Sequence, residues 1–169
     1  YWLGSEGLNM EFVSNIDEMT DKKSGAIFVN NGPVYMAIYG HDEYTIWARK
    51  DDLLFANDGQ HLIRAGENKP FSLSAMSKRN GLKPTNNKEA ESVITSLLKG
   101  EEVKIRYFDW PKYDKIDIKI KNPNLAYVYN KAVEMFGWKN LGIPPVLAPV
   151  KLSVYTPKEP DSAGYAAVN

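Results

Sequence analysis

Over the first hundred positions, short apolar runs are separated by residues that favour turns. The runs lie at 10–13, 26–29, 34–39, 44–48, 53–56 and 61–64. Runs of this length bounded by Gly, Asn and Asp are typical of β-strands. A further run at 69–73 contains Pro70, which restricts it to an edge strand or a strand start. The pattern therefore predicts a series of antiparallel strands.

Two of the separating segments contain the dipeptides found in tight hairpins. Asn30-Asn31-Gly32 joins the second and third runs, and Asn57-Asp58-Gly59 joins the fifth and sixth. A type I′ turn needs positive φ at both central residues, which Asn-Gly and Asp-Gly tolerate. We therefore expect both segments to cap hairpins. Residues 76–85 contain Asn80-Gly81 and Pro84, and are expected to form a loop.

Two amphipathic helices are predicted in the second half of the chain. In the first, at 88–99, apolar residues recur at helical spacing: Ala90, Val93, Ile94, Leu97 and Leu98. Asn87 is placed to cap this helix, and Gly100 to end it. The second helix, at 125–136, follows Pro123 and stops at Gly137.

Between the helices, two segments alternate strictly between apolar and polar residues. They lie at 103–107 and 116–120, and each places its apolar residues on one face. Such alternation indicates one buried face and one face in water. The expected fold is α+β and mostly β, with a twisted antiparallel sheet or sandwich, two late helices and an extended C-terminal arm.

The arm begins after Trp138, so the predicted organisation is a strand-rich domain at 1–138 followed by an arm at 139–169. Five of the ten prolines lie between Pro144 and Pro160. The arm is nevertheless apolar, through Leu141, Ile143, Val146, Leu147, Val150, Leu152, Val154 and Tyr155. Apolar side chains in this number are rarely left in water. We expect them to bind a protein partner or another copy of the chain, or alternatively to lie along their own domain.

Charge and composition exclude several kinds of chemistry. Lys plus Arg and Asp plus Glu both number 21, so the chain lacks the basic excess that is usual in nucleic-acid binding proteins. It contains no cysteine, which excludes disulfides, cysteine-ligated metals and thiol catalysis. No apolar run approaches the roughly 20 residues of a transmembrane helix. No cofactor or metal is expected.

The best candidate for a catalytic motif is His41-Asp42-Glu43, where a histidine adjoins two acids. It is consistent with a general base or a metal ligand, but also with a hairpin turn in water, and we favour the turn. The glycine-rich patterns of nucleotide-binding loops are absent, and so is the Gly-x-Ser-x-Gly motif of serine hydrolases.

The polar face of the late hairpin is the most plausible ligand surface. Its candidate residues are Lys104, Arg106, Lys115 and Lys119, with Trp110 and Tyr113 near the turn. A basic strip beside aromatic residues suits a polyanion. The alternative is an ordinary solvated sheet face on which Asp114 and Asp117 form cross-strand ion pairs.

The order of elements from Lys69 to Trp138 resembles the invasion-associated locus B-like family and the related domain of type VI secretion accessory proteins. The resemblance rests on Leu97-Leu98-Lys99-Gly100, Glu102-Val103-Lys104-Ile105-Arg106, Ile116-Asp117-Ile118-Lys119-Ile120 and Leu125-Ala126-Tyr127-Val128, and on two early segments, Ser14-Asn15-Ile16-Asp17 and Asp21-Lys22-Lys23. It implies a bacterial exported β-rich domain without known catalysis. The chain departs from the family in lacking paired cysteines.

Three functions remain open on sequence grounds. The favoured one is a non-enzymatic structural subunit that docks to its neighbours through the arm. The second is a ligand- or polyanion-binding module that uses the 103–121 hairpin, and the third is an enzyme whose carboxylates converge only in the folded chain. An exported location is favoured over a cytoplasmic one. Because the sequence starts at Tyr1, we expect either a removed leader or a start part-way along a longer chain.

Overall fold

A computed structural model describes residues 9–145 of the chain. Its strands, in chain order, are β1 (Asn9–Ile16), β2 (Lys23–Asn31), β3 (Val34–Ile38), β4 (Tyr44–Ala48), β5 (Leu54–Phe55), β6 (His61–Ala65), β7 (Phe71–Ala75), β8 (Gly81–Pro84), β9 (Val103–Trp110) and β10 (Lys115–Ile120). Its helices are α1 (Asn87–Leu98) and α2 (Leu125–Phe136). The predicted fold, mostly β with two late helices, is confirmed.

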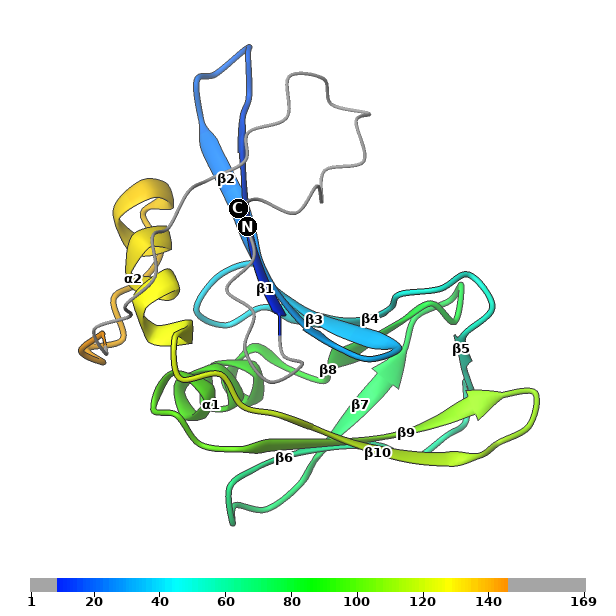
Figure 1. The fold of residues 1–169 in the computed structure, drawn as a ribbon. Helices are drawn as coiled ribbons and strands as arrows, with labels where there is room; N and C mark the ends of the chain where they lie inside the picture. Colours follow the sequence, from blue (N-terminus) through cyan, green and yellow to red (C-terminus); the bar gives the residue numbers. More distant parts are fainter. Residues whose placement is uncertain (1–8, 146–169) are drawn as a thin grey trace.

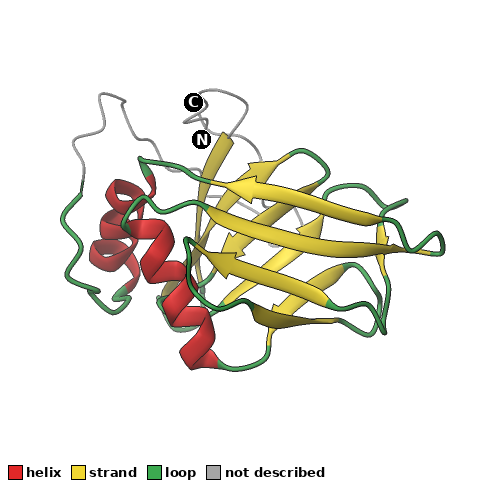
Figure 2. Cartoon of the chain, turned by 90° about the horizontal axis from the view of Figure 1, so that it is seen from below, coloured by secondary structure: helices red, strands yellow, loops and turns green. Residues whose placement is uncertain are grey.

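The ten strands described form one antiparallel sheet that is curved but does not close (Figure 1). Its order is β1-β2-β3-β4-β8-β7-β6-β9-β10, with β5 beside the end of β9. The β1–β2 hairpin projects beyond the rest of the sheet, and α2 lies against β2 (Figure 1). Both helices gather at one end of the strands (Figure 2).

The main core lies between the concave face of the sheet and the two helices. The apolar stripe of α1 is buried as the helical spacing predicts, and α2 buries Leu125, Val128 and Tyr129. Phe136 of α2 contacts the ring of Phe12 in β1, with the ring centroids 5.5 Å apart. The helix limits differ from prediction by one residue at α1, because Asn86 rather than Asn87 accepts the N–H of Glu89, at 2.8 Å.

The predicted β2–β3 hairpin is present, but its turn lies one residue further along. Asn31 pairs with Val34, so the central residues are Gly32 and Pro33. Gly32 has φ +60°, whereas a proline ring holds φ near −65°. A type I′ turn at this position is therefore excluded, and only the first central residue needs the left-handed conformation.

The second predicted hairpin is wrong. β5 and β6 do not pair with each other; both run antiparallel to β9, one after the other. Leu54 lies opposite Trp110 and Leu62 opposite Arg106, so four extra residues are inserted between the two paired stretches. Asn57-Asp58-Gly59 belongs to this bulge. The dipeptide favours a reversal locally, but a non-local partner determines the pairing.

His61 fills the gap that the bulge leaves in the ladder. Its Nδ1 accepts the backbone N–H of Phe108 at 3.2 Å, and its Nε2 lies 2.7 Å from the carbonyl oxygen of Ala56. The Nε2–H tautomer therefore satisfies both backbone groups. The ring is buried, and burial lowers the pKa of His61. This histidine has a structural role as a neutral side chain.

The predicted loop at 76–85 is also wrong in part, because residues 81–84 form β8. This strand pairs with both β4 and β7 and completes the middle of the sheet. Gly81 sits where a Cβ would lie 2.7 Å from the Met76 sulfur and 3.0 Å from the Trp47 ring. A glycine that reads locally as a turn is thus a strand residue under close packing.

Candidate binding surfaces

The convex face of β6, β9 and β10 carries the polar residues of the late hairpin. Arg64 on β6, Lys104 on β9 and Lys119 on β10 lie directly opposite one another in a single cross-strand row. The next row contains Leu62, Arg106 and Asp117. Three of the six predicted ligand-binding residues, Lys104, Arg106 and Lys119, are therefore brought together on this face.

Arg106 forms an ion pair with Asp117 and is therefore not available to a ligand. Its Nε donates to Asp117 Oδ1 at 2.8 Å and its Nη2 donates to Oδ2 at 3.0 Å, which is the two-pronged geometry expected of arginine with a carboxylate. The hydrogen bonds from Arg106 lower the pKa of Asp117. The cross-strand ion pair considered for Asp117 on sequence grounds is thus present.

These rows line a shallow groove of about 460 Å³, which we call the cationic groove. Its walls and floor are Leu62, Arg64, Pro70, Lys104, Ile105, Arg106, Asp117, Ile118 and Lys119. Four of these residues are cations and one is an acid. The contributions of Leu62, Arg64 and Pro70 were missed from the sequence, because the β6–β9 pairing joins segments about forty residues apart.

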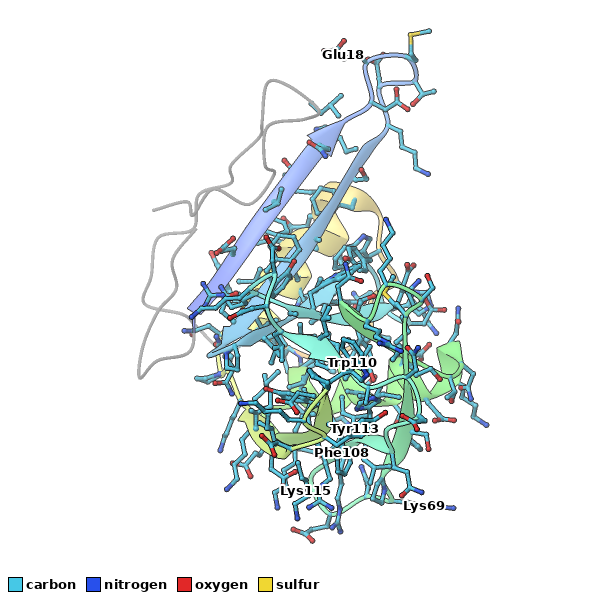
Figure 3. The ribbon with its side chains drawn as sticks, turned by 90° about the vertical axis from the view of Figure 1, so that its right-hand side faces the viewer. Glu18, Lys69, Phe108, Trp110, Tyr113 and Lys115 are labelled. Atoms are coloured by element: carbon cyan, nitrogen blue, oxygen red, sulfur yellow. The ribbon has the colours of Figure 1, made fainter. Side chains whose placement is uncertain are left out.

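The other predicted ligand residues lie outside the groove. Tyr113 donates a hydrogen bond to Asp58 Oδ1 at 2.8 Å, and this bond raises the pKa of Tyr113. The guanidinium of Arg79 lies 4.3 Å from the ring centre of Trp110. Trp110 and Tyr113 remain 37% and 47% exposed. Phe108, Tyr113 and Lys115 mark this end of the molecule, far from Glu18 at the tip of the β1–β2 hairpin (Figure 3).

The convex face of β1–β4 is apolar instead. We call it the outer apolar face, and it comprises Val13, Ala26, Phe28, Tyr35, Ala37, Tyr39 and Trp47. The rings of Phe28 and Tyr35 contact each other at 5.5 Å between centroids, and Trp47 Nε1 donates to the Tyr39 hydroxyl at 2.8 Å. The main core and both helices lie on the opposite side of these strands.

A buried polar pair lies beside this face. Asn30 Nδ2 donates to Glu11 Oε1 at 3.3 Å, and both side chains are buried. Together with Phe28, Tyr35, Ala48 and Arg49 they line a pocket of about 240 Å³. Val13, Ala26, Phe28 and Ala37 are themselves at most 7% exposed.

Only the start of the predicted arm falls within the described residues. Leu141 and Ile143 are partly buried against the main core. Tyr129 of α2 donates to the carbonyl oxygen of Lys139 at 2.7 Å, and Asn130 donates to that of Ile143 at 3.2 Å. The arm therefore begins on its own domain. The remaining predicted contact residues, Val146, Leu147, Val150, Leu152, Val154 and Tyr155, lie outside the described residues.

His41 lies in the β3–β4 turn, as expected, and makes contacts with acids from two segments. Its Nε2 is 3.4 Å from Asp42 Oδ2 and 3.8 Å from Glu91 Oε2 on α1. Asn87 donates to Asp42 at 3.2 Å, and Lys139 lies 3.5 Å from Glu91. The acids are thus held by neighbouring donors. Across residues 9–145, no three His, Asp or Glu side chains are arranged to hold a metal ion.

Comparisons with protein-family models, with curated proteins and with solved structures found no match to this chain. The resemblance to the locus B-like family stays a prediction. In the part of the chain that is described, neither helix has the length and apolar character needed to cross a membrane. The two surfaces defined above are therefore the basis for proposing a function.

Proposed function

We propose that this protein is a non-enzymatic assembly subunit in which the arm of one copy docks on the outer apolar face of the next copy. The observation that carries the proposal is the outer apolar face itself. It is a second apolar cluster, separate from the main core, on the side of β1–β4 that faces away from the helices. Its three partly exposed rings, Tyr35, Tyr39 and Trp47, still offer apolar area, and burying such area is worth about 25 cal/mol per Å².

The composition of the arm matches this surface. Beyond Pro145 it contains Val146, Leu147, Val150, Leu152 and Val154, and residues 150–154 alternate between apolar and polar without a proline. Such alternation suits an extended segment with one face on an apolar surface. β1 is the last strand in the sheet order and pairs, among the described strands, with β2 alone. An extended segment on the outer apolar face can therefore also follow β1.

The anchoring of the arm favours a neighbouring copy over the same copy. Residues 139–143 are fixed to α2, and α2 packs on the core side of β1 and β2 through Phe136. The outer apolar face lies on the other side of these strands. To reach its own face, the arm must turn around the edge of the sheet, whereas Pro144-Pro145 favours an extended course.

The test is the mass of the protein in solution. Deleting residues 146–169 should reduce an oligomer to a monomer and leave the fold intact, because Leu141 and Ile143 remain in place. A matched control that deletes residues 157–169 keeps the apolar part of the arm and should still assemble. Sedimentation of the three proteins at equal concentration provides the measurement.

A mixing experiment distinguishes an arm that docks on a neighbouring copy from an arm that docks on its own copy. Tyr35→Lys damages the outer apolar face and leaves the arm, while the 146–169 deletion does the reverse. Neither protein should assemble alone, but together they should form a pair through one arm and one face. Tyr127→Lys, on a partly buried tyrosine of α2 away from this face, is the control and should assemble as the unaltered protein does. A full-length chain that is monomeric would overturn the proposal.

A further inference from the structure

We propose that the cationic groove binds a linear acidic polysaccharide that carries one negative group on each sugar. The groove lies on β6, β9 and β10, at the other end of the sheet order from β1. This proposal does not depend on the arm or on its docking surface. Docking of the arm on a neighbouring copy does not require the cationic groove or a ligand bound in it.

The central evidence is the row formed by Arg64, Lys104 and Lys119. Like charges directly opposite on neighbouring strands destabilise a sheet. Neighbouring strands lie about 4.8 Å apart, so this row places three cations across about 10 Å. An arrangement that costs stability is expected where a ligand supplies the missing negative charge.

The chain itself neutralises the row only in part. Glu67, whose side chain is 95% exposed, lies 3.5 Å from Arg64 Nη2, and Glu102 lies 3.9 Å from Lys119 Nζ. Lys104, in the centre, makes no ion pair with any residue of the described chain. Asp117 is occupied by Arg106. The centre of the groove therefore keeps a net positive charge.

Arg64 is positioned in advance. Its Nε donates to the carbonyl oxygen of Asn68 at 2.7 Å, and its Nη2 donates to that of Glu67 at 3.2 Å. These bonds hold the guanidinium against the β6–β7 turn and leave its other N–H donors for a ligand. Leu62 and Pro70 add a small apolar floor beside the row. Together they suit a thin ring that bears a carboxylate or a sulfate.

The spacing of the row favours a glycan over an acidic peptide. In an extended peptide, side chains on the same face repeat every two residues, or about 6.6 Å. A linear glycan with an acid on every sugar is not restricted to this two-residue repeat. A chain that crosses β6, β9 and β10 can thus present one acidic sugar to each cation of the row.

Two observations disfavour a nucleic acid. The chain has no net positive charge to attract a polyphosphate over long range. Binding of single strands also relies on aromatic faces on which bases stack. Here Arg79 covers Trp110, and the hydroxyl of Tyr113 is bound to Asp58, both outside the cationic groove.

The experiment measures the affinity of the full chain for a six-sugar oligogalacturonate by titration calorimetry at low salt. Lys104→Gln and Arg64→Gln should each weaken binding about tenfold, because each removes one charge-assisted contact. Lys115→Gln is the matched control. It removes the same charge from the same face of the hairpin, but from outside the groove, and should leave the affinity within about twofold. Thermal melting of each variant checks that it is folded.

Three results would overturn the proposal. One is no measurable binding of the oligogalacturonate by the unaltered protein. Another is an equal loss of affinity in Lys115→Gln and Lys104→Gln, which would show attraction to the whole surface rather than to the row. The last is a single-stranded oligonucleotide of equal charge that binds as tightly as the glycan and loses affinity in the same variants.

Discussion

The two halves of the sheet share one core but differ on their convex sides. In β2, residues 26–30 are all buried, so both faces of the strand are covered. In β10, exposed residues alternate with partly or fully buried ones, so only the concave face of that strand is in contact with the core. The first half of the sheet is therefore buried on both faces, and the second half on its concave face only.

The sequence carries this difference in its patterning. Residues 26–29 form an unbroken apolar run, whereas 103–107 and 116–120 alternate. An unbroken run in a strand is typical of burial on both faces, and alternation of burial on one. The same contrast separates the two proposals, since an apolar face suits a protein segment and a cationic face suits an anionic ligand.

The largest loss of stability is expected from a substitution at Gly25, where the first half of the sheet packs against α2. A Cβ at this position would overlap the ring of Phe136 and the carbonyl oxygen of Val13. Because the second of these is backbone, Gly25→Ala should lower the free energy of unfolding by about 3 kcal/mol. Gly40→Ala, in a turn with nothing within 4 Å of the new Cβ, is the control. Equal denaturant midpoints for the two variants would show that α2 does not pack here.

A smaller loss of stability is expected in the second half of the sheet, at the bulge between β5 and β6. His61→Leu removes the acceptor for the Phe108 N–H and the donor to the Ala56 carbonyl, leaving both groups buried without partners. The free energy of unfolding should fall by about 2 kcal/mol. His41→Gln, in a partly exposed turn, should change it by less than about 0.5 kcal/mol. If urea unfolding shows a larger loss of stability in His41→Gln than in His61→Leu, His61 does not stabilise the bulge.

The turn of the β2–β3 hairpin should respond more weakly. Gly32 has φ +60°, with open space around it, so Gly32→Val introduces backbone strain alone. A β-branched residue in this conformation should cost about 1 kcal/mol. Gly40→Val provides a control outside the left-handed region. An unchanged melting temperature in Gly32→Val would contradict the assigned turn.

The smallest effect is a dependence on pH that arises in the second half. Burial lowers the pKa of His61 in the folded state, so the unfolded state binds a proton first as the pH falls. Stability from this group is complete above the unfolded pKa of about 6.5 and declines below it until the folded pKa is reached. Urea midpoints measured between about pH 7.5 and pH 5.5 should fall more in the unaltered protein than in His61→Leu. If the urea midpoint depends on pH in the same way in both proteins, His61 is not a buried neutral histidine.

Local patterns were sufficient to predict most elements of this chain. The stripe of Val93, Ile94 and Leu97 and the stop at Gly100 define α1 to within a residue, and the alternation around Ile105 and Ile118 defines the β9–β10 hairpin. The cations of that hairpin were also placed on the correct face. In each case the interacting residues lie within a single helix or a single hairpin.

Only the tertiary structure decided which distant segments are neighbours. β8 lies in a segment that reads as a loop, and becomes a strand because β4 and β7 supply partners on both sides. Asp58-Gly59 belongs to a bulge, because β5 and β6 both pair with β9. Arg64 joins Lys104 and Lys119 through the non-local pairing of β6 with β9, so the third cation of the row has no signature in the sequence. Short-range preferences determine elements, but backbone groups that must find partners determine the sheet.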